Sequence, residues 1–338
     1  MGDILWRIEI HRGVDKNLVC ETIITCQLSR LDVGCTTGVR TKMRVITTVK
    51  EMASVCPGWG SSSTVGLVPT MGYLHEGHFA LVRRARIEND LVIVSIFVNP
   101  TQFAPHEDFE RYPRDVHRDL CMLEAEGVDI VFTPSVDEMY PAGYVTYVEQ
   151  SGPLVEQAEG KRRPGHFRGV ATVVLKLFHI VQPQRAYFGQ KDAQQVAVIA
   201  RMVTDLNLPL SLCIVSTVRE PDGLAMSSRN VYLTAEQRVA ARVLYRALQA
   251  GRRIFETHPE QGVATVVQVM TETVAAEPLV HLDYAEVRDF HSFLPLEVLQ
   301  APALLVIAAY VGSVRLIDNS VLLADGTWDT RYQTDQIA

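Results

Sequence analysis

Two histidines stand three positions apart in the stretch VPTMGYLHEGH, as His75 and His78, with Gly77 between them. An apolar segment precedes them and a helix-like run follows, so they lie where a strand turns into a helix. The first turn of a helix offers unpaired N–H groups and a positive dipole end, which suit phosphate. Imidazoles can donate hydrogen bonds to phosphate oxygens, and a protonated imidazole would add charge. The pattern favours a phosphate site over two ordinary surface or core histidines.

The HxGH spacing is typical of the HIGH-type nucleotidyltransferase superfamily, which includes class I aminoacyl-tRNA synthetases and small adenylyl- and cytidylyltransferases. The sequence contains no GxxxxGK[ST] phosphate loop, and the stretch around His75 is not a GxGxxG dinucleotide fingerprint. The site therefore resembles an adenylyl-transfer site, in which histidine takes the place of the phosphate-loop lysine.

Further polar residues follow other predicted strands. SIFVNPTQF (95–103) places Asn99 and Gln102 just past a strand, and neutral amides suit a substrate that carries hydroxyls and a carboxylate. In FGQKDAQQ (188–195), Lys191 can meet a phosphate, and Asp192 can hold a lysine, a ribose or a metal. Gln195 follows on the first helical turn. These residues predict a substrate site beside the phosphate site.

Two loops complete the candidate site. EGKRRPGHFRGV (159–170) is a basic loop rich in Gly and Pro, which we expect to be mobile; a solvated charged loop is the alternative. GLAMSSRN (223–230) carries Ser227, Ser228 and Arg229 and is similar to the KMSKS-type loop that clamps the triphosphate in this superfamily. Taken alone, MSSR is a weak signal.

The elements that position these residues alternate between strand-like and helix-like patterns from Thr64 to about Thr217. This alternation predicts an α/β fold, a Rossmann-like doubly wound parallel sheet with helices on both faces. A longer helix (234–256) and three strand-like segments follow, which predict a second, smaller α+β C-terminal domain. The expected division is an N-terminal extension (1–42), a Rossmann-like domain (43–217), a smaller lid domain (218–324) and a polar tail (325–338).

The composition is that of an ordinary globular protein of 338 residues, with 47% hydrophobic and 21% charged residues. A formal net charge of -7 argues against nucleic-acid binding. The sequence has no run of 18 apolar residues, so we expect no membrane-spanning helix. Charges are scattered near the N-terminus, where a signal peptide would need an apolar core. Six cysteines without a CxxC pair predict reduced thiols and a cytoplasmic protein.

Taken in order, the motifs PTMGYLHEGH, SIFVNPTQF, RPGHFRGV, FGQKDAQQ and DGLAMSSRN resemble those of the pantothenate synthetase family (pantoate–β-alanine ligase, AMP-forming). The likeness runs from about Met43 to about Ala324, with RLIDN (315–319) near its end. It implies ATP-dependent ligation of (R)-pantoate and β-alanine through a pantoyl adenylate, which releases pyrophosphate and AMP in pantothenate biosynthesis. It also implies Mg²⁺, a homodimer, and a smaller domain that closes over ATP.

The resemblance also implies residue roles. It places ATP on Met71, Gly72, Tyr73, Leu74, His75, Glu76, Gly77, His78, Gly189, Gln190, Lys191, Asp192, Val218, Met226, Ser227, Ser228 and Arg229. It places pantoate on Gln102 and Gln195, with Gln102 also near β-alanine, and Asn99 is a further substrate candidate. We expect His78, His75, Lys191 and Arg229 to be catalytic. In the family His78 would be a proton donor, and stabilising phosphate charge is an equally good role. No metal ligand and no catalytic cysteine is assigned.

Three features depart from the family pattern. Gln190 stands where Glu is usual, and we expect it to be tolerated. CPGWGSSSTVG replaces a short basic turn before the first strand. Residues 1–42 have no counterpart; they are either an added element or the product of a start codon placed too far upstream. We expect a protein that begins at Met43 to keep full activity.

Rival functions are weaker. The paired amides Gln102 and Gln195 speak against a nicotinate-mononucleotide adenylyltransferase, and a short acidic chain speaks against a tRNA synthetase. A silent ATP-binding homologue would lack an HxGH histidine or Lys191, and all three residues are present.

Overall fold

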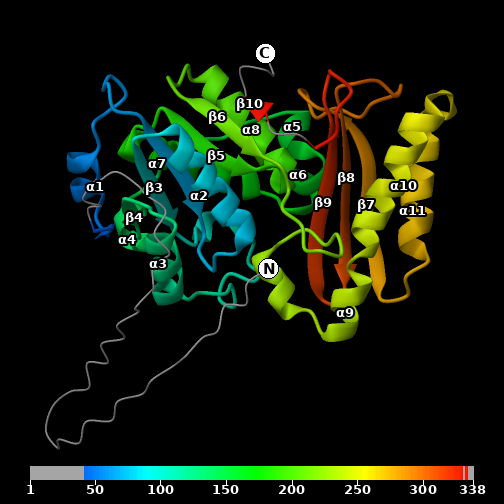
Figure 1. The fold of residues 1–338 in the computed structure, drawn as a ribbon, viewed down its shortest axis with the longest axis horizontal. Helices are drawn as coiled ribbons and strands as arrows, with labels where there is room; N and C mark the ends of the chain where they lie inside the picture. Colours follow the sequence, from blue (N-terminus) through cyan, green and yellow to red (C-terminus); the bar gives the residue numbers. More distant parts are fainter. Residues whose placement is uncertain (1–41, 330–331, 334–338) are drawn as a thin grey trace, which may run out of the picture. The chain divides into compact units, whose positions relative to one another are not determined.

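The computed structural model describes residues 42–329 and 332–333, so the expected N-terminal extension lies outside the described residues apart from Lys42. Two sheets organise this part of the chain (Figure 1). The larger sheet has the strand order β1-β4-β3-β2-β5-β6-β10, and the smaller one has the order β7-β8-β9.

Strands β1 to β6 of the larger sheet run parallel to one another. The βα alternation predicted this for β2 to β6, whereas β1 precedes Thr64 and was not predicted. Their bounds are β1 (Arg44–Ile46), β2 (Val65–Thr70), β3 (Leu91–Ile96), β4 (Ile130–Phe132), β5 (Arg185–Gly189) and β6 (Ser211–Val215). β10 (Tyr332–Gln333) pairs antiparallel with β6, although it falls in the range that we expected to be a polar tail. The expected domain boundaries remain predictions.

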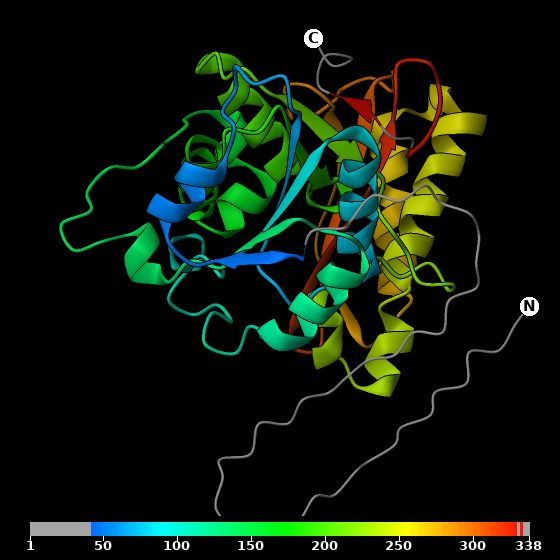
Figure 2. The same cartoon turned by 60° about the vertical axis from the view of Figure 1, so that its left-hand side comes forward.

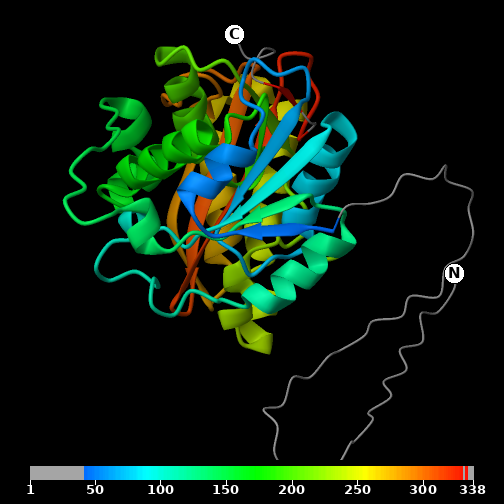
Figure 3. The same cartoon turned by 90° about the vertical axis from the view of Figure 1, so that its left-hand side faces the viewer.

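Helices cover both faces of the larger sheet, which Figure 3 shows with the strands between the two helical layers. One buried cluster joins the sheet to α1 (Val49–Val55), α7 (His166–Val181) and α8 (Ala193–Asp205). The cluster on the opposite face joins it to α2 (Glu76–Glu88) and α3 (Val116–Ala125). Burial on both faces explains why VGLVPT and LVIVSI are apolar almost throughout. The doubly wound, Rossmann-like prediction is confirmed.

Short elements connect these layers. They are the 3-10 helices η1 (Pro100–Gln102) and η2 (Gln190–Asp192) and the helices α4 (Val136–Met139), α5 (Pro153–Glu156) and α6 (Ala158–Arg162). The segment 159–170, expected to be a mobile loop, is therefore helical at both ends.

The smaller sheet is antiparallel and consists of β7 (Val280–Asp289), β8 (Ala303–Val311) and β9 (Val314–Leu322). The helices α10 (Val243–Thr257) and α11 (Gly262–Ala275) pack along one face of it, as Figure 2 shows in yellow. This arrangement confirms the predicted smaller α+β part. The predicted single helix over 234–256 is instead divided into α9 (Ala235–Ala240) and α10, and η3 (Ser228–Tyr232) and η4 (Pro259–Gln261) are 3-10 helices.

Within the described residues, no helix is long and apolar enough to cross a membrane. Cys56, Cys121 and Cys213 are free thiols. Burial raises the pKa of Cys56 to about 12 and that of Cys213 to about 11, so neither thiol is poised to act as a nucleophile.

Candidate active site

The strand order reverses between β2 and β5, which are neighbours in the sheet but not in the sequence. Ligands of open α/β sheets bind at such a switch point, beyond the carboxyl ends of the strands. The HxGH motif follows β2, and Lys191 follows β5. The fold thus brings the two predicted phosphate-binding motifs together from positions more than 100 residues apart in the sequence.

The two histidines cap the start of α2. His75 Nδ1 accepts from the backbone N–H of Gly77 at 3.1 Å, and His78 Nδ1 accepts from the backbone N–H of His75 at 3.3 Å. Each Nδ1 is thus an acceptor, so each neutral ring carries its proton on Nε2 and can donate it to a ligand. A Cβ at position 77 would lie 2.9 Å from the His75 ring, which explains the glycine between them.

Both imidazoles are neutral at pH 7. Burial and the nearby Lys191 lower the pKa of His75 to about 4, although Asp192 opposes the shift. Burial, His75 and Lys191 hold the pKa of His78 well below its usual value. A protonated imidazole would add charge, but these shifts favour the neutral form of both rings. The rings offer neutral donors, and positive charge at the site comes from Lys191, Arg163 and Arg229.

A buried carboxylate holds the turn that precedes the histidines. Asp119 of α3 has no exposed surface, and it accepts the N–H groups of Tyr73 at 2.6 Å and Leu74 at 2.9 Å. Gly72 has a φ of +81°, and a Cβ there would lie 3.1 Å from the Asp119 carboxylate. Asp119 was not predicted from the sequence, although an Asp four residues before the buried Leu123 on an amphipathic helix is a usable signal.

Two of the three predicted substrate amides, Asn99 and Gln102, lie together after β3. Asn99 Nδ2 donates to Gln102 Oε1 at 3.1 Å and to the Gly169 carbonyl at 3.2 Å, and Tyr140 donates to Asn99 Oδ1 at 2.8 Å. Asn99 is 1% exposed and its amide is engaged with protein groups. Its geometry therefore suits orienting Gln102 better than direct substrate contact.

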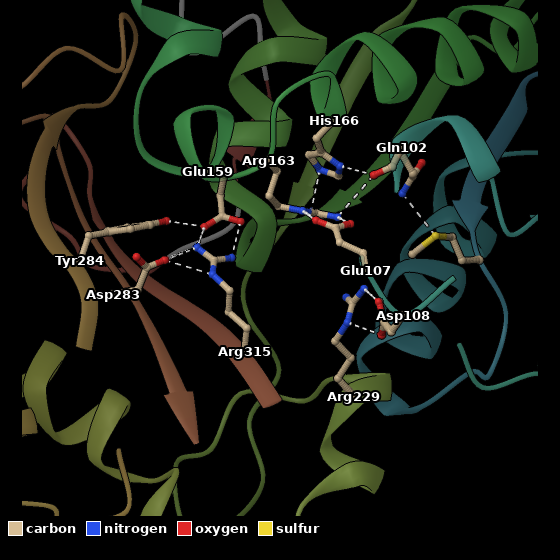
Figure 4. A network of polar contacts seen from close by, with 11 residues as sticks. Gln102, Glu107, Asp108, Glu159, Arg163, His166, Arg229, Asp283, Tyr284 and Arg315 are labelled. Carbon is tan, nitrogen blue, oxygen red and sulfur yellow. Dashed lines mark hydrogen bonds and ion pairs between the residues drawn. The ribbon is translucent and has the colours of Figure 1, made fainter. Parts of the chain in front are cut away.

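The MSSR loop docks on the HxGH turn. The Ser228 hydroxyl donates to the Tyr73 carbonyl at 3.2 Å. Arg229 donates to Asp108 through Nε at 2.9 Å and Nη2 at 2.8 Å, as Figure 4 shows. Its guanidinium also lies 5.5 Å from the Tyr112 ring centroid. The loop is thus held against the segment that follows η1.

Side-chain contacts anchor the basic segment between α6 and α7. Arg163 donates to Glu107 through Nε at 2.6 Å and Nη2 at 2.7 Å. His166 Nδ1 donates to the Gln102 carbonyl at 2.8 Å (Figure 4). Burial and the Arg163 charge lower the pKa of His166 to about 4. This segment was part of the predicted site, but the positions of Arg163 and His166 facing the pocket were not predicted.

A pocket of about 230 Å³ opens at this point. Most predicted site residues line it: Met71, His75, Gly77, His78, Asn99, Gln102, Gly189, Lys191, Asp192, Gln195, Val218, Met226, Ser227, Ser228 and Arg229. The other predicted residues lie outside its lining: Gly72, Tyr73, Leu74, Glu76 and Gln190. Thr217 also lines it, and its buried hydroxyl has no hydrogen-bond partner in the described part of the chain.

No group of three or more His, Cys, Asp or Glu side chains is placed to hold a metal ion within the described ranges. Asp192 is the carboxylate that lines the pocket, and its Oδ1 lies 3.7 Å from Lys191 Nζ. A divalent cation here would need oxygen ligands from a substrate, as Mg²⁺ commonly takes from nucleotide phosphates.

A doubly wound sheet with an HxGH turn, a lysine and an MSSR loop at its switch point has the arrangement of a HIGH-type nucleotidyltransferase. The family model for pantoate-beta-alanine ligase matches residues 44–321. The chain therefore belongs to the pantoate–β-alanine ligase family.

Individual relatives agree with the family model. The pantothenate synthetase of Roseiflexus sp. (strain RS-1) is 57% identical over 282 residues, which cover 83% of this chain and 100% of the relative. That of Thermotoga neapolitana is 52% identical over 281 residues, with the same coverage.

Solved structures of the same family superpose on the chain. A pantothenate synthetase from Thermus thermophilus has a TM-score of 0.79 at 51% identity and covers 82% of this chain and 98% of its own. The pantoate–β-alanine ligase from Francisella tularensis, complexed with β-γ ATP and β-alanine, has a TM-score of 0.68 at 35% identity, with 82% and 97% coverage.

Proposed function

We propose that this chain, an enzyme of the pantoate–β-alanine ligase family, joins pantoate to β-alanine in two steps in the pocket at the switch point. The pantoate carboxylate attacks the α-phosphorus of ATP, which forms pantoyl adenylate and releases pyrophosphate. The β-alanine amine then attacks the acyl carbon, which forms the amide bond of pantothenate and releases AMP. The observation that carries the proposal is the convergence of the HxGH turn, Lys191 and the MSSR loop on one pocket.

Negative charge builds on the α-phosphate in the first step, so fixed donors aimed at it supply most of the catalysis. We assign the positive charge to Lys191 and Arg229 and neutral Nε2–H donors to His75 and His78. In the second step, a neutral His78 can donate its Nε2 proton to the departing phosphate oxygen. The ATP site comprises these residues together with the others for which the family resemblance implies ATP contact.

The amides receive the organic substrates. Gln102 and Gln195 line the pocket, and each can accept from a pantoate hydroxyl and donate to its carboxylate. We assign both to pantoate, and Gln102 also to β-alanine. Asn99 orients Gln102 through the 3.1 Å hydrogen bond between their side chains.

We also propose that Mg²⁺ arrives with ATP and is held mainly by the phosphates, with Asp192 as the carboxylate available to it. Residues 218–324 form the smaller domain that closes over ATP in this proposal. The family resemblance supports a cytoplasmic homodimer. Sedimentation at micromolar concentration tests the dimer, and a monomer mass would contradict it.

An AMP-release assay tests the function directly. Pantoate, β-alanine and ATP are supplied together, and each is then omitted in turn. We expect AMP only with the complete mixture, whereas ATP and pantoate alone leave a tightly held adenylate, because the acyl phosphate is kept from water. AMP release that is unchanged without pantoate would refute the proposal.

A further inference from the structure

RLIDN (315–319) is the motif that the site has not yet explained. It lies on β9, the edge strand of the smaller sheet, and its last two residues reach the two phosphate-binding segments. We propose that Asp318 and Asn319 are positioning residues, which fix the MSSR loop and the Lys191 turn, respectively, relative to one another. This inference rests on the proposed function, because it concerns where the phosphate donors stand.

Asn319 holds the backbone of the Lys191 turn. Its Nδ2 donates to the carbonyl of Gln190 at 2.9 Å and to the carbonyl of Lys191 at 2.8 Å. Its Oδ1 accepts from Gln190 Nε2 at 3.3 Å. Asn319 is 2% exposed, so these bonds are shielded from water. The Asn319 side chain thus bonds to the two peptide groups that flank Lys191 and orient its side chain towards the pocket.

Asp318 holds the other segment through Arg219. Asp318 Oδ2 and Oδ1 accept from Arg219 Nη1 at 2.6 Å and Nη2 at 3.0 Å. Arg219 Nη1 also donates to the Gly223 carbonyl at 3.2 Å. Arg219 is bridged to Ala225 in an antiparallel pair, and the Met226 N–H donates to the Val218 carbonyl at 3.0 Å. Asp318 therefore anchors a small hairpin that leads directly into Ser227, Ser228 and Arg229.

The two anchors point to opposite faces of β9 because successive side chains in a strand alternate. Pairing between β8 and β9 is continuous from Val314 to Leu322, so no bulge disturbs this alternation. Leu316, on the Asp318 side, belongs to the cluster with α10 and α11. Ile317, on the Asn319 side, packs with residues of the larger part such as Ala193. One edge strand therefore stands between the two phosphate-binding segments and bonds to each.

The competing explanation is that Asp318 and Asn319 only hold the smaller sheet against the rest of the chain. Other contacts already do this. Arg315 pairs with Glu159 at 2.6 Å and with Asp283 at 2.8 Å, and Tyr284 donates to Glu159 at 2.8 Å (Figure 4). None of these three contacts involves the Lys191 turn. Asn319 differs because it bonds to the carbonyl of Lys191 itself. Misplacing a reacting group by about 1 Å can cost about 100-fold in rate, so this contact bears on catalysis.

The test is a double-mutant cycle between Asn319→Ala and Lys191→Ala. Pantoate-dependent ATP–pyrophosphate exchange gives kcat and the KM values of ATP and pantoate, and calorimetry gives the Kd of ATP. We expect Asn319→Ala to lower kcat/KM for ATP by about 10- to 100-fold. The KM of pantoate should stay within about twofold, because the amide site is not touched. In the Lys191→Ala background, Asn319→Ala should cost less than about twofold more.

Two further variants keep the test decisive. Asn319→Asp retains the shape and the acceptor but loses the donor, and it should reproduce the ATP defect if Asn319→Ala does not fold. Leu316→Ala weakens the same strand from its core side, and it should lower the melting temperature while leaving kcat within about twofold. Equal kcat losses in Leu316→Ala and Asn319→Ala would reduce Asn319 to a structural residue.

Failure of this proposal is distinguishable from failure of the proposed function. Wild-type exchange that depends on pantoate, together with additive effects of Asn319→Ala and Lys191→Ala, refutes only the positioning role. ATP–pyrophosphate exchange that does not depend on pantoate refutes the proposed function. In that case the double-mutant cycle is evaluated from the Kd of ATP. Additive changes in that Kd overturn the positioning role, and non-additive changes support it.

Discussion

Asp108 and Arg229 form a two-point ion pair between segments 121 residues apart, with N–O distances of 2.8 and 2.9 Å. Asp108 engages Nε and Nη2 of the guanidinium, which leaves Nη1 to reach a phosphate. The Tyr112 ring lies beside the same guanidinium. Arg229 is thus held in one orientation, and in the proposed ATP site this reduces the conformational freedom lost on binding.

The first prediction follows from this pair. Arg229→Lys keeps the positive charge but loses the planar fork, so it should lower kcat/KM for ATP by about tenfold or more. Initial rates at varied ATP concentration measure the loss. Arg201→Lys is the matched control, because Arg201 is an exposed residue of α8 that pairs with Asp205 within its own helix. Full activity in Arg229→Lys would show that charge alone suffices.

The second prediction concerns His78. His78→Ala removes the donor that we propose acts on the reacting phosphate, so it should lower turnover by about 100-fold or more while the fold survives. Circular dichroism checks the fold, and the exchange assay checks the turnover. His117→Ala, an exposed change on α3, should have no effect. Near-wild-type turnover in His78→Ala would remove His78 from the mechanism.

The third prediction is a pH dependence of stability. The pKa of His166 is about 4 in the folded protein and about 6.5 in an unfolded chain. The unfolded chain therefore binds more protons between these values, so the unfolding free energy falls as the pH is lowered from 6.5 towards 4. His166, which is 8% exposed, contributes up to about 1.4 kcal/mol per pH unit in this window.

Urea unfolding at pH 7, 6 and 5 measures this slope, and comparison with the variants separates the histidine contribution from that of carboxyls such as Asp119, whose pKa is raised by burial. His75, whose pKa is also lowered to about 4, adds to it with the same sign. His166→Gln should give a shallower slope than the wild type, and His117→Gln should not. An unchanged slope in His166→Gln would mean that folding does not lower the pKa of His166.

The fourth prediction explains the unusual Gln190. Its Nε2 donates to Asp329 Oδ1 at 3.0 Å, its Oε1 has no hydrogen-bond partner within the described residues, and the side chain is fully buried. Gln190→Glu would place a second carboxylate against Asp329, so it should lower the unfolding free energy by about 1–3 kcal/mol. Asp329→Asn should restore part of the loss in the double variant. A gain in activity of orders of magnitude in Gln190→Glu would instead mark the natural enzyme as impaired.

Much of the larger sheet was predictable from the sequence because its strands and helices have distinct patterns. Continuous apolar runs predicted β2 and β3, and turn residues separated them from the helices. The HxGH turn, Lys191 and the MSSR loop were each recognisable from their own short motifs. The rules of parallel-sheet topology then predicted that such motifs meet at one edge.

The missed features depend on contacts between distant segments. α11 has the sequence GVATVVQVMTETVA, whose β-branched residues favour a strand, and only the burial of Val266, Met270 and Val274 on one face reveals a helix. Asp119 and Asn319 act through backbone groups that are 46 and 128 residues away in the sequence, respectively. The lowered histidine pKa values depend on burial that no local pattern expresses.

Because the side chains of Asp318 and Asn319 point to opposite faces of β9, the number of residues in this strand determines which side each of them faces. Inserting or deleting one residue between the turn at Gly312 and Asp318 would turn each anchor towards the wrong side of the sheet. The segment after Leu322 does not control the direction of either anchor, so changes of length there leave both in place. Across related chains, the spacing within this strand should therefore vary less than the lengths of the loops that flank it.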